Sequence, residues 1–241
     1  MEPSGLKRYR ERATDLFNRV AMAFMPPGKQ REYAARVRKA AFVRIMAEQR
    51  WGGDLSGGGS TLDYTRVTRD IIEHVIRTFE VRSMLDAGCG DHAWMPLLLD
   101  KLNGDFRYVG GDIVPDLVEH HRQHYPGRQF EVIDFVKDEL PKCDLIFCRD
   151  VIQHLPVRDA IAVLRNFSGS GAGYLLTTTH LRRFGWRNGR DRRVGQCHDR
   201  NLLLKPFSLA DPVAIFSEQD PGHKFLGLWK LPLHTVDGGP L

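Results

Sequence analysis

The fold is decided by the stretch Ser83-Met84-Leu85-Asp86-Ala87-Gly88-Cys89-Gly90-Asp91. Its apolar first half predicts a buried strand, because short apolar runs bounded by turn residues are typical of parallel sheets. The two glycines predict a tight turn whose backbone can approach a ligand, since a Cβ would block that approach. Residues 93–99 then begin a helix. This order of strand, glycine turn and helix opens a nucleotide-binding α/β unit.

An acid stands at the end of this strand, directly before the turn. The carboxylate of Asp86 would repel a pyrophosphate but attract a cation, such as the α-ammonium group of an amino acid. The alternative is an ordinary dinucleotide site, because Gly88, Gly90 and Ala93 also satisfy the weaker dehydrogenase pattern.

Residues 85–90 resemble the first motif of class I S-adenosylmethionine-dependent methyltransferases. The resemblance implies an α/β fold, Rossmann-like and doubly wound, with a mostly parallel seven-stranded sheet. It also implies S-adenosylmethionine as cofactor and S-adenosylhomocysteine as product. Asp86, Gly88 and Gly90 would then hold the amino-acid end of the cofactor.

Two more predicted strands end in acids. Residues 106–112 end in Asp112, which lies 22 residues after Gly90, close to the roughly 20 residues expected for a carboxylate that binds ribose hydroxyls. Residues 129–134 end in Asp134, followed by Phe135. The resemblance implies that Ile113, Asp134 and Phe135 hold the adenine, although Asp134 could instead cap the following turn.

The fourth predicted strand, residues 143–148, contains Asp144 and resembles the family's fourth motif. In that motif the residues after the strand face the methyl donor, so Arg149 is assigned to cofactor binding. We expect four carboxylates at the carboxyl edge of the sheet, an arrangement that a dehydrogenase does not need: Asp86, Asp112, Asp134 and Asp144.

Three residues are candidates for catalysis. His154 follows the fourth strand, and a neutral imidazole can accept a hydroxyl proton near pH 7; the alternative is a histidine that caps the next helix. His180, at the end of the fifth strand (residues 173–180), is the second candidate. Asp150 could assist either histidine or bind a divalent metal. A metal is not favoured, because no second carboxylate ligand follows the fifth strand.

The first 50 residues carry twelve Lys and Arg against five Asp and Glu, although the net charge of the whole chain is only +5. Helices are predicted over residues 6–25 and 32–50, separated by Pro26-Pro27-Gly28. The resemblance places a helical lid here. The basic face would suit an anionic partner such as nucleic acid, or it is simply solvated. Residues 51–61 predict a glycine-rich loop that closes over ligand, or a linker.

The remaining chain predicts helices at 63–78 and 159–167 and strands at 213–218 and 224–230. Between the fifth and sixth strands, residues 180–212 form an arginine-rich segment, in the place where the family builds its acceptor site. Guanidinium groups there would orient an anionic or polyhydroxylated acceptor, although an exposed basic loop has the same composition. The arginines are Arg182, Arg183, Arg187, Arg190, Arg192, Arg193 and Arg200.

Length and composition predict one main domain, residues 61–241, after a helical lid and glycine-rich loop, residues 1–60. With 241 residues and 42% hydrophobic content, the chain can bury a sizeable core. No apolar run approaches the roughly 18 residues that span a bilayer. The four cysteines lack the spacing of a zinc site or a disulfide framework, so we expect a cytoplasmic protein with reduced thiols.

Together these features predict a methyltransferase that acts on a hydroxyl of a small polar acceptor, such as a sugar or a natural product. An RNA methyltransferase is the first alternative, motivated by the basic N-terminal region. Against it, Cys148-Arg149-Asp150-Val151 replaces the Pro-Pro-Tyr type of tetrapeptide found in enzymes that methylate amino groups of nucleic acids. The second alternative is a non-catalytic module that binds S-adenosylmethionine.

Overall fold

The computed structural model describes residues 24–52, 56–102, 104–181, 188–189, 193–218 and 223–241. The chain divides into two compact units, residues 1–40 and 41–241. Two sequence predictions fall largely outside the described residues. These are the helix at 6–25 and the arginines of the arginine-rich segment, five of whose seven lie outside: Arg182, Arg183, Arg187, Arg190 and Arg192.

The first described helix is α2, Pro27–Ala47. It starts five residues before the predicted helix at 32–50 and ends three residues before that helix's end. Proline is tolerated in the first turn of a helix, where its missing N–H has no intrahelical partner. The sequence Pro26-Pro27-Gly28 therefore starts this helix, whereas we had expected it only to separate two helices.

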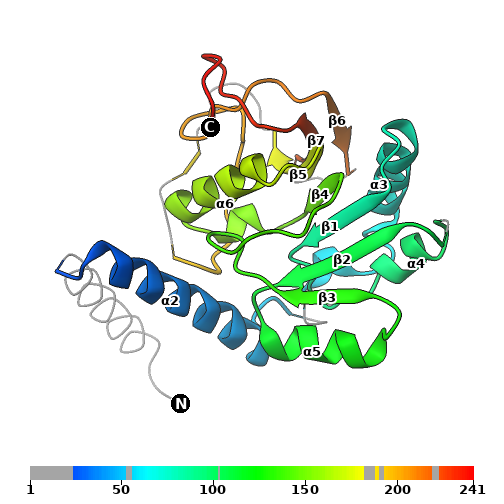
Figure 1. The fold of residues 1–241 in the computed structure, drawn as a ribbon, viewed down its shortest axis with the longest axis horizontal. Coiled ribbons are helices and arrows are strands. Elements are labelled where there is room, and N and C mark those ends of the chain that lie inside the picture. The colour runs from blue at the N-terminus through cyan, green and yellow to red at the C-terminus, as the bar shows by residue number, and fades with distance from the viewer. Residues whose placement is uncertain (1–23, 53–55, 103, 182–187, 190–192, 219–222) are drawn as a thin grey trace. The chain divides into compact units, whose positions relative to one another are not determined.

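Seven strands form one sheet in residues 41–241, as the resemblance implied (Figure 1). Their spatial order is β3-β2-β1-β4-β5-β7-β6. β7 runs antiparallel to its neighbours β5 and β6, and the other pairs are parallel. The strands are β1 Ser83–Ala87, β2 Arg107–Asp112, β3 Gln129–Val132, β4 Leu145–Cys148, β5 Tyr174–His180, β6 Ala214–Ser217 and β7 Lys224–Lys230.

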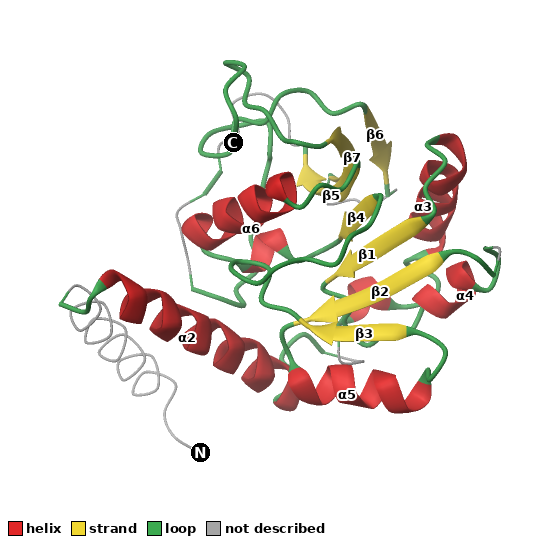
Figure 2. Ribbon diagram, viewed as in Figure 1, coloured by secondary structure: helices red, strands yellow, loops and turns green. Residues whose placement is uncertain are grey.

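Helices cover both faces of the sheet (Figure 2). One hydrophobic cluster includes residues of α3, α4 and α5, and the other includes residues of α6. β1 is buried along its whole length, as its continuous apolar run predicts. The helices and short 3-10 turns are α3 Arg66–Thr78, α4 Met95–Leu99, α5 Pro115–His124, α6 Val157–Gly169, η1 Gly58–Ser60 and η2 Ile152–His154.

The parallel strands bring the residues that follow β1, β2, β4 and β5 to one edge of the sheet. Asp86 lies opposite Gly110 in the β1–β2 pair. Because β7 is antiparallel, its first residue, Lys224, lies opposite His180, the last residue of β5. The carboxyl edge therefore also receives residues from the far end of the chain. No helix in the described part of the chain is long and apolar enough to cross a membrane.

One predicted carboxylate lies at the other edge. Asp144 precedes β4, and its N–H donates to the carbonyl of Ser83, the first residue of β1 (3.1 Å). Its carboxylate accepts hydrogen bonds from the Arg82 N–H (2.9 Å) and the Ser83 hydroxyl (2.8 Å). The expectation of four carboxylates at the carboxyl edge is wrong for Asp144, because an acid that begins a parallel strand lies at the amino edge.

Candidate functional site

The turn after β1 uses its glycines for backbone conformation and for space. Gly88 has a φ of 93° and Gly90 a φ of 53°, in the region that favours glycine. A Cβ on Gly88 would lie 2.3 Å from Cγ2 of Val151, and one on Gly90 would lie 2.4 Å from Oγ of Ser56. No larger residue fits either position without moving a neighbour.

The carboxylate of Asp86 is buried beside this turn, with only 3% of the residue exposed. Its Oδ2 accepts a hydrogen bond from the Tyr108 hydroxyl at 2.8 Å. Burial, and more weakly the charge of Asp112, raise the pKa of Asp86 to about 7, although Tyr108 and Arg149 act in the opposite direction. A buried carboxylate of this kind gains strongly from a cationic partner.

Asp112 ends β2 within reach of the same turn. Its carboxylate accepts hydrogen bonds from the N–H of Gly90 (3.2 Å) and from that of Val114 (3.1 Å). Burial raises its pKa in spite of these donors. Ile113, half-buried, follows directly. Two acids and two glycines therefore meet at one point of the carboxyl edge, as the sequence predicts.

Asp134 and Phe135, which follow β3 closely, are both buried in the protein. Phe135 is only 7% exposed, and its ring packs edge-on against Phe167 with centroids 5.9 Å apart. The Oδ1 of Asp134 accepts the Val136 N–H at 3.2 Å. Asp134 thus takes part in the following turn, the alternative that the sequence left open, and its role toward adenine stays a prediction.

Arg149 and Asp150, which follow β4, belong to a buried network of ion pairs. Arg149 Nε lies 2.7 Å from Glu218 Oε1, and Arg149 Nη1 lies 3.1 Å from Asp150 Oδ2. Lys224 Nζ lies 3.0 Å from the same Asp150 oxygen. The ring of Tyr64 covers both cations, 5.7 Å from the Arg149 guanidinium and 4.8 Å from Lys224 Nζ.

This network determines the protonation of Asp150. Burial alone would raise its pKa, but Arg149 and Lys224 hold the pKa of this carboxyl well below its usual range. Asp150 is therefore ionised and paired with both Arg149 and Lys224. It is poorly suited to take up a proton near pH 7. The described residues contain no cluster of three or more His, Cys, Asp or Glu that could hold a metal ion.

His154 ends the η2 turn and contacts the segment that precedes the domain. The rings of His154 and Trp51 lie 4.8 Å apart, and Trp51 in turn packs edge-on against Phe42 at 6.2 Å. Burial, with a smaller contribution from His198, lowers the pKa of His154 to about 4, and Asp150 opposes this shift. The imidazole is therefore neutral near pH 7, the form that accepts a proton, and the lowered pKa makes it a weaker base than an ordinary histidine.

His180 is less free to act as a base. Its Nδ1 accepts the backbone N–H of Arg200 at 3.2 Å, so the neutral ring carries its proton on Nε2, which lies 3.6 Å from Asp199 Oδ1. Burial lowers the pKa of His180, against the effect of Asp199. Arg200 itself is buried and donates from Nη2 to the Leu155 carbonyl at 3.3 Å, so it does not offer its charge to an exposed acceptor.

Sequence reasoning missed several residues that build this edge. Ser56 and Asp91 form reciprocal hydrogen bonds, from Ser56 N–H to Asp91 Oδ2 (3.2 Å) and from Asp91 N–H to Ser56 Oγ (2.8 Å). Nε2 of His121, on α5, lies 2.7 Å from the carbonyl oxygen of Gly90. The partners of Ser56 and His121 are distant in sequence, so no local pattern indicates them.

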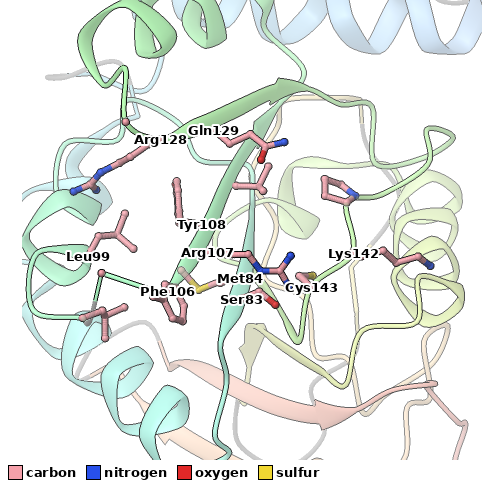
Figure 3. A pocket seen from close by; sticks show the side chains of 15 residues that line it. Ser83, Met84, Leu99, Phe106, Arg107, Tyr108, Arg128, Gln129, Lys142 and Cys143 are labelled. Carbon is pink, nitrogen blue, oxygen red and sulfur yellow. The ribbon is translucent and has the colours of Figure 1, made fainter.

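A separate hollow of about 600 Å³ lies at the opposite edge of the sheet (Figure 3). Ser83, Arg107 and Gln129, which line it, are the first residues of β1, β2 and β3. Ligands of open α/β sheets bind at the carboxyl ends of the strands. This hollow is therefore distinct from the acidic glycine turn.

Comparison with known proteins adds to this geometry. The profile of a family described as "Methyltransferase domain" matches residues 60–212, more than half of the chain. No curated protein matches the sequence.

The fold is similar to solved structures that share only 15% sequence identity with the chain. The 1,6-didemethyltoxoflavin-N1-methyltransferase of Burkholderia thailandensis, solved with 1,6-didemethyltoxoflavin and S-adenosylhomocysteine, has a TM-score of 0.59, covering 83% of this chain and 89% of that one. Magnesium protoporphyrin IX methyltransferase of Synechocystis, solved with S-adenosylmethionine, has a TM-score of 0.57, covering 80% and 97%. The N-methyltransferase NodS of Bradyrhizobium japonicum, solved with S-adenosylhomocysteine, has a TM-score of 0.55, covering 81% and 99%.

Proposed function

Because the chain belongs to the family of methyltransferase domains, we propose that it transfers a methyl group from S-adenosylmethionine to a hydroxyl of a small polar acceptor, such as a sugar or another natural product. The family match and the seven-stranded sheet confirm the resemblance of residues 85–90 to class I methyltransferases. The acceptor and the choice of oxygen are our proposal, since the similar structures include enzymes named for methylation at nitrogen.

The buried acidic glycine turn carries the proposal for the cofactor. Asp86 is enclosed and needs a cation, while Gly88 and Gly90 let the turn pass close to the side chains of Val151 and Ser56. An adenosyl amino acid supplies an ammonium group to such a site. A dinucleotide would bring its pyrophosphate against Asp86 and Asp112, and like charges in a buried site repel.

The other cofactor contacts follow from the same edge. Asp112 would bind the ribose hydroxyls, and Ile113, Asp134 and Phe135 would border the adenine. Arg149, beside Asp86, would face the charged end of the cofactor. The positive charge of its guanidinium group lowers the pKa of Asp86. A metal has no part in this proposal.

The cofactor, when bound, supplies a methyl carbon made electrophilic by the adjacent sulfonium. The protein's own residues must align the acceptor, exclude water and remove the hydroxyl proton. We assign the removal of this proton to the neutral imidazole of His154. The ring of Trp51, which packs beside that imidazole, would form one side of the acceptor site. One similar structure contains the small molecule 1,6-didemethyltoxoflavin, which supports an acceptor of this size.

Cofactor binding is tested by titrating S-adenosylhomocysteine in a calorimeter. Asp112→Asn should weaken binding at least about tenfold, because hydrogen bonds to a charged group contribute about 1.5–3 kcal/mol. Asp144→Asn is the matched control, since that carboxylate lies at the amino edge, and its dissociation constant should stay within about threefold of the wild type. Tight binding of a nicotinamide dinucleotide with no uptake of S-adenosylhomocysteine would overturn the proposal.

Transfer of a labelled methyl group to sugars, other hydroxylated natural products and RNA tests the acceptor. His154→Ala should lower turnover about 100-fold or more, the usual contribution of a general base, while the dissociation constant of S-adenosylhomocysteine changes less than about threefold. An unchanged rate removes His154 as the base. Label found only in RNA favours the RNA methyltransferase, and no transfer despite cofactor binding favours the non-catalytic module.

A further inference from the structure

Asp86 is the first member of a buried chain of three polar side chains. The hydroxyl of Tyr108 lies 2.8 Å from Oδ2 of Asp86 and 3.2 Å from Nδ1 of His92. His92 is 1% exposed and Tyr108 is 8% exposed. Neither residue belongs to the set that the sequence indicated for the cofactor.

The direction of these hydrogen bonds follows from the number of protons. A tyrosine hydroxyl has one proton, and an ionised carboxylate can only accept. Tyr108 therefore donates to Asp86, and its oxygen accepts from His92, whose proton is on Nδ1. Burial, and more weakly the neighbouring His121 and Arg128, lower the pKa of His92 to about 3, so the imidazole is neutral and its single N–H is committed to Tyr108.

The sheet register makes this chain possible. Met84 pairs with Tyr108 and Asp86 pairs with Gly110, so the side chains of Asp86 and Tyr108 lie on the same face. A Cβ on Gly110 would lie 3.1 Å from the Tyr108 hydroxyl oxygen. The missing side chain of Gly110 leaves the space in which the hydroxyl reaches Asp86.

The backbone of the glycine turn and the surrounding rings hold the third member in place. His92 has a φ of 57°, in the left-handed region that few residues other than glycine adopt. Its ring lies 4.8 Å from that of Tyr125 and 5.0 Å from that of Phe130. The imidazole is thus held from several sides, which fixes the direction of its N–H.

We propose that Tyr108 and His92 are positioning residues for cofactor binding. They hold one oxygen of Asp86 by a directed hydrogen-bond chain and leave Oδ1 to receive the ammonium group of the cofactor. This inference rests on the proposed function, because it assumes that Asp86 binds that group. It adds a role for two residues that do not themselves touch the cofactor.

The chain also favours the ionised form of Asp86, which is the form that binds a cation. Burial raises the pKa of Asp86 to about 7, and the hydrogen bond from Tyr108 is the largest effect that lowers it. Loss of that bond should raise the pKa further. The ionisable groups that interact with Asp86 are Tyr108, Asp112, Arg149, Cys89 and Cys148.

The test is the pH dependence of S-adenosylhomocysteine binding, measured by calorimetry between pH 5.5 and 9 in two buffers of different ionisation enthalpy. Wild-type affinity should fall on acidification with a midpoint near the pKa of Asp86 in the ligand-free protein, and binding below that midpoint should release a proton. Tyr108→Phe should move the midpoint upward by about one pH unit, while the affinity at pH 9 changes less than about threefold.

Tyr125→Phe is the matched control. It removes a hydroxyl from a ring that also packs on His92, but that hydroxyl makes no hydrogen bond to Asp86 in the described part of the chain, so the midpoint should not move.

A second pair of variants tests His92. His92→Asn keeps an N–H near Nδ1 and tolerates a positive φ, so it should retain the wild-type midpoint, whereas His92→Ala should raise it. This second pair decides the question if Tyr108→Phe does not fold.

The outcomes separate the two proposals. If wild-type protein does not bind S-adenosylhomocysteine at any pH, the proposed function is wrong. If it binds with a pH midpoint that Tyr108→Phe and His92→Ala leave unchanged in folded protein, Asp86 still serves the cofactor but the positioning role is wrong.

Discussion

At the scale of the residue, Asp86 is a buried carboxylate whose charge destabilises the ligand-free fold. Asp86 is buried beside Asp112, and its pKa is raised from 3.8 to about 7. The folded state therefore binds the proton more tightly than the unfolded state does. The resulting penalty is absent below about pH 4, grows between pH 4 and 7, and is complete above pH 7.

Removing this charge should stabilise the ligand-free protein. Asp86→Asn should raise the free energy of unfolding above pH 7 by up to about 4 kcal/mol, since one pKa unit corresponds to about 1.36 kcal/mol, and should abolish S-adenosylhomocysteine binding. Urea unfolding at pH 5 and pH 8 measures the difference, which should be larger at pH 8. A variant that is less stable at both pH values would contradict the expectation.

Asp144 provides the opposite case at the amino edge. Hydrogen bonds from Ser83 and Arg82 lower its pKa in spite of the desolvation that raises it. Its contribution to stability is present above the unfolded pKa and is lost as the pH falls through the folded one. Asp144→Asn should therefore destabilise the protein at pH 8 and have less effect under acid conditions.

At the scale of the element, a buried ion-pair network joins β4, β6 and β7 to the segment before β1. Glu218 follows β6 and contacts Arg149 after β4, Lys224 at the start of β7, and Thr68 on α3 through a 2.6 Å hydrogen bond. Arg149 also donates from Nη1 to the Gly59 carbonyl at 3.0 Å. These contacts bring the glycine-rich loop and the last two strands to the residues that follow β4.

Glu218→Gln should lower the free energy of unfolding by about 3–5 kcal/mol, because it leaves two buried cations with one fewer counter-charge. Glu73→Gln is the control. Its ion pair with Arg77 on α3 is exposed on the arginine side, and such surface pairs contribute about 0–1 kcal/mol. Urea unfolding compares the two variants, and equal losses would show that burial does not govern the contribution of the Glu218 network.

At the scale of the whole molecule, residues 41–241 contain both hydrophobic clusters and every proposed cofactor residue. A protein that begins at residue 41 should therefore unfold cooperatively and bind S-adenosylhomocysteine within about threefold of the full chain. Calorimetry and thermal unfolding measure both quantities. A loss of more than tenfold would place part of the cofactor site in residues 1–40.

Local patterns carried much of the fold. β1 and β7 begin at their predicted residues, and α3 lies within the predicted helix at 63–78. α5 was missed because its apolar residues, Leu117 and Val118, are few among polar neighbours.

By itself, the sequence determined the glycine turn and the acids near the ends of β1 and β2, because these depend on short-range periodicity and backbone conformation, whereas the seven-stranded sheet was implied by the family resemblance of residues 85–90. Only the tertiary structure decided the environment of each acid. It enclosed Asp86 with Tyr108 and His92, and it paired the ionised Asp150 with Lys224 from 74 residues away. It also placed Asp144 at the amino edge of the sheet. The physical reason is that charge, burial and hydrogen bonding depend on neighbours in space, and β-sheet register brings those neighbours together from distant parts of the chain.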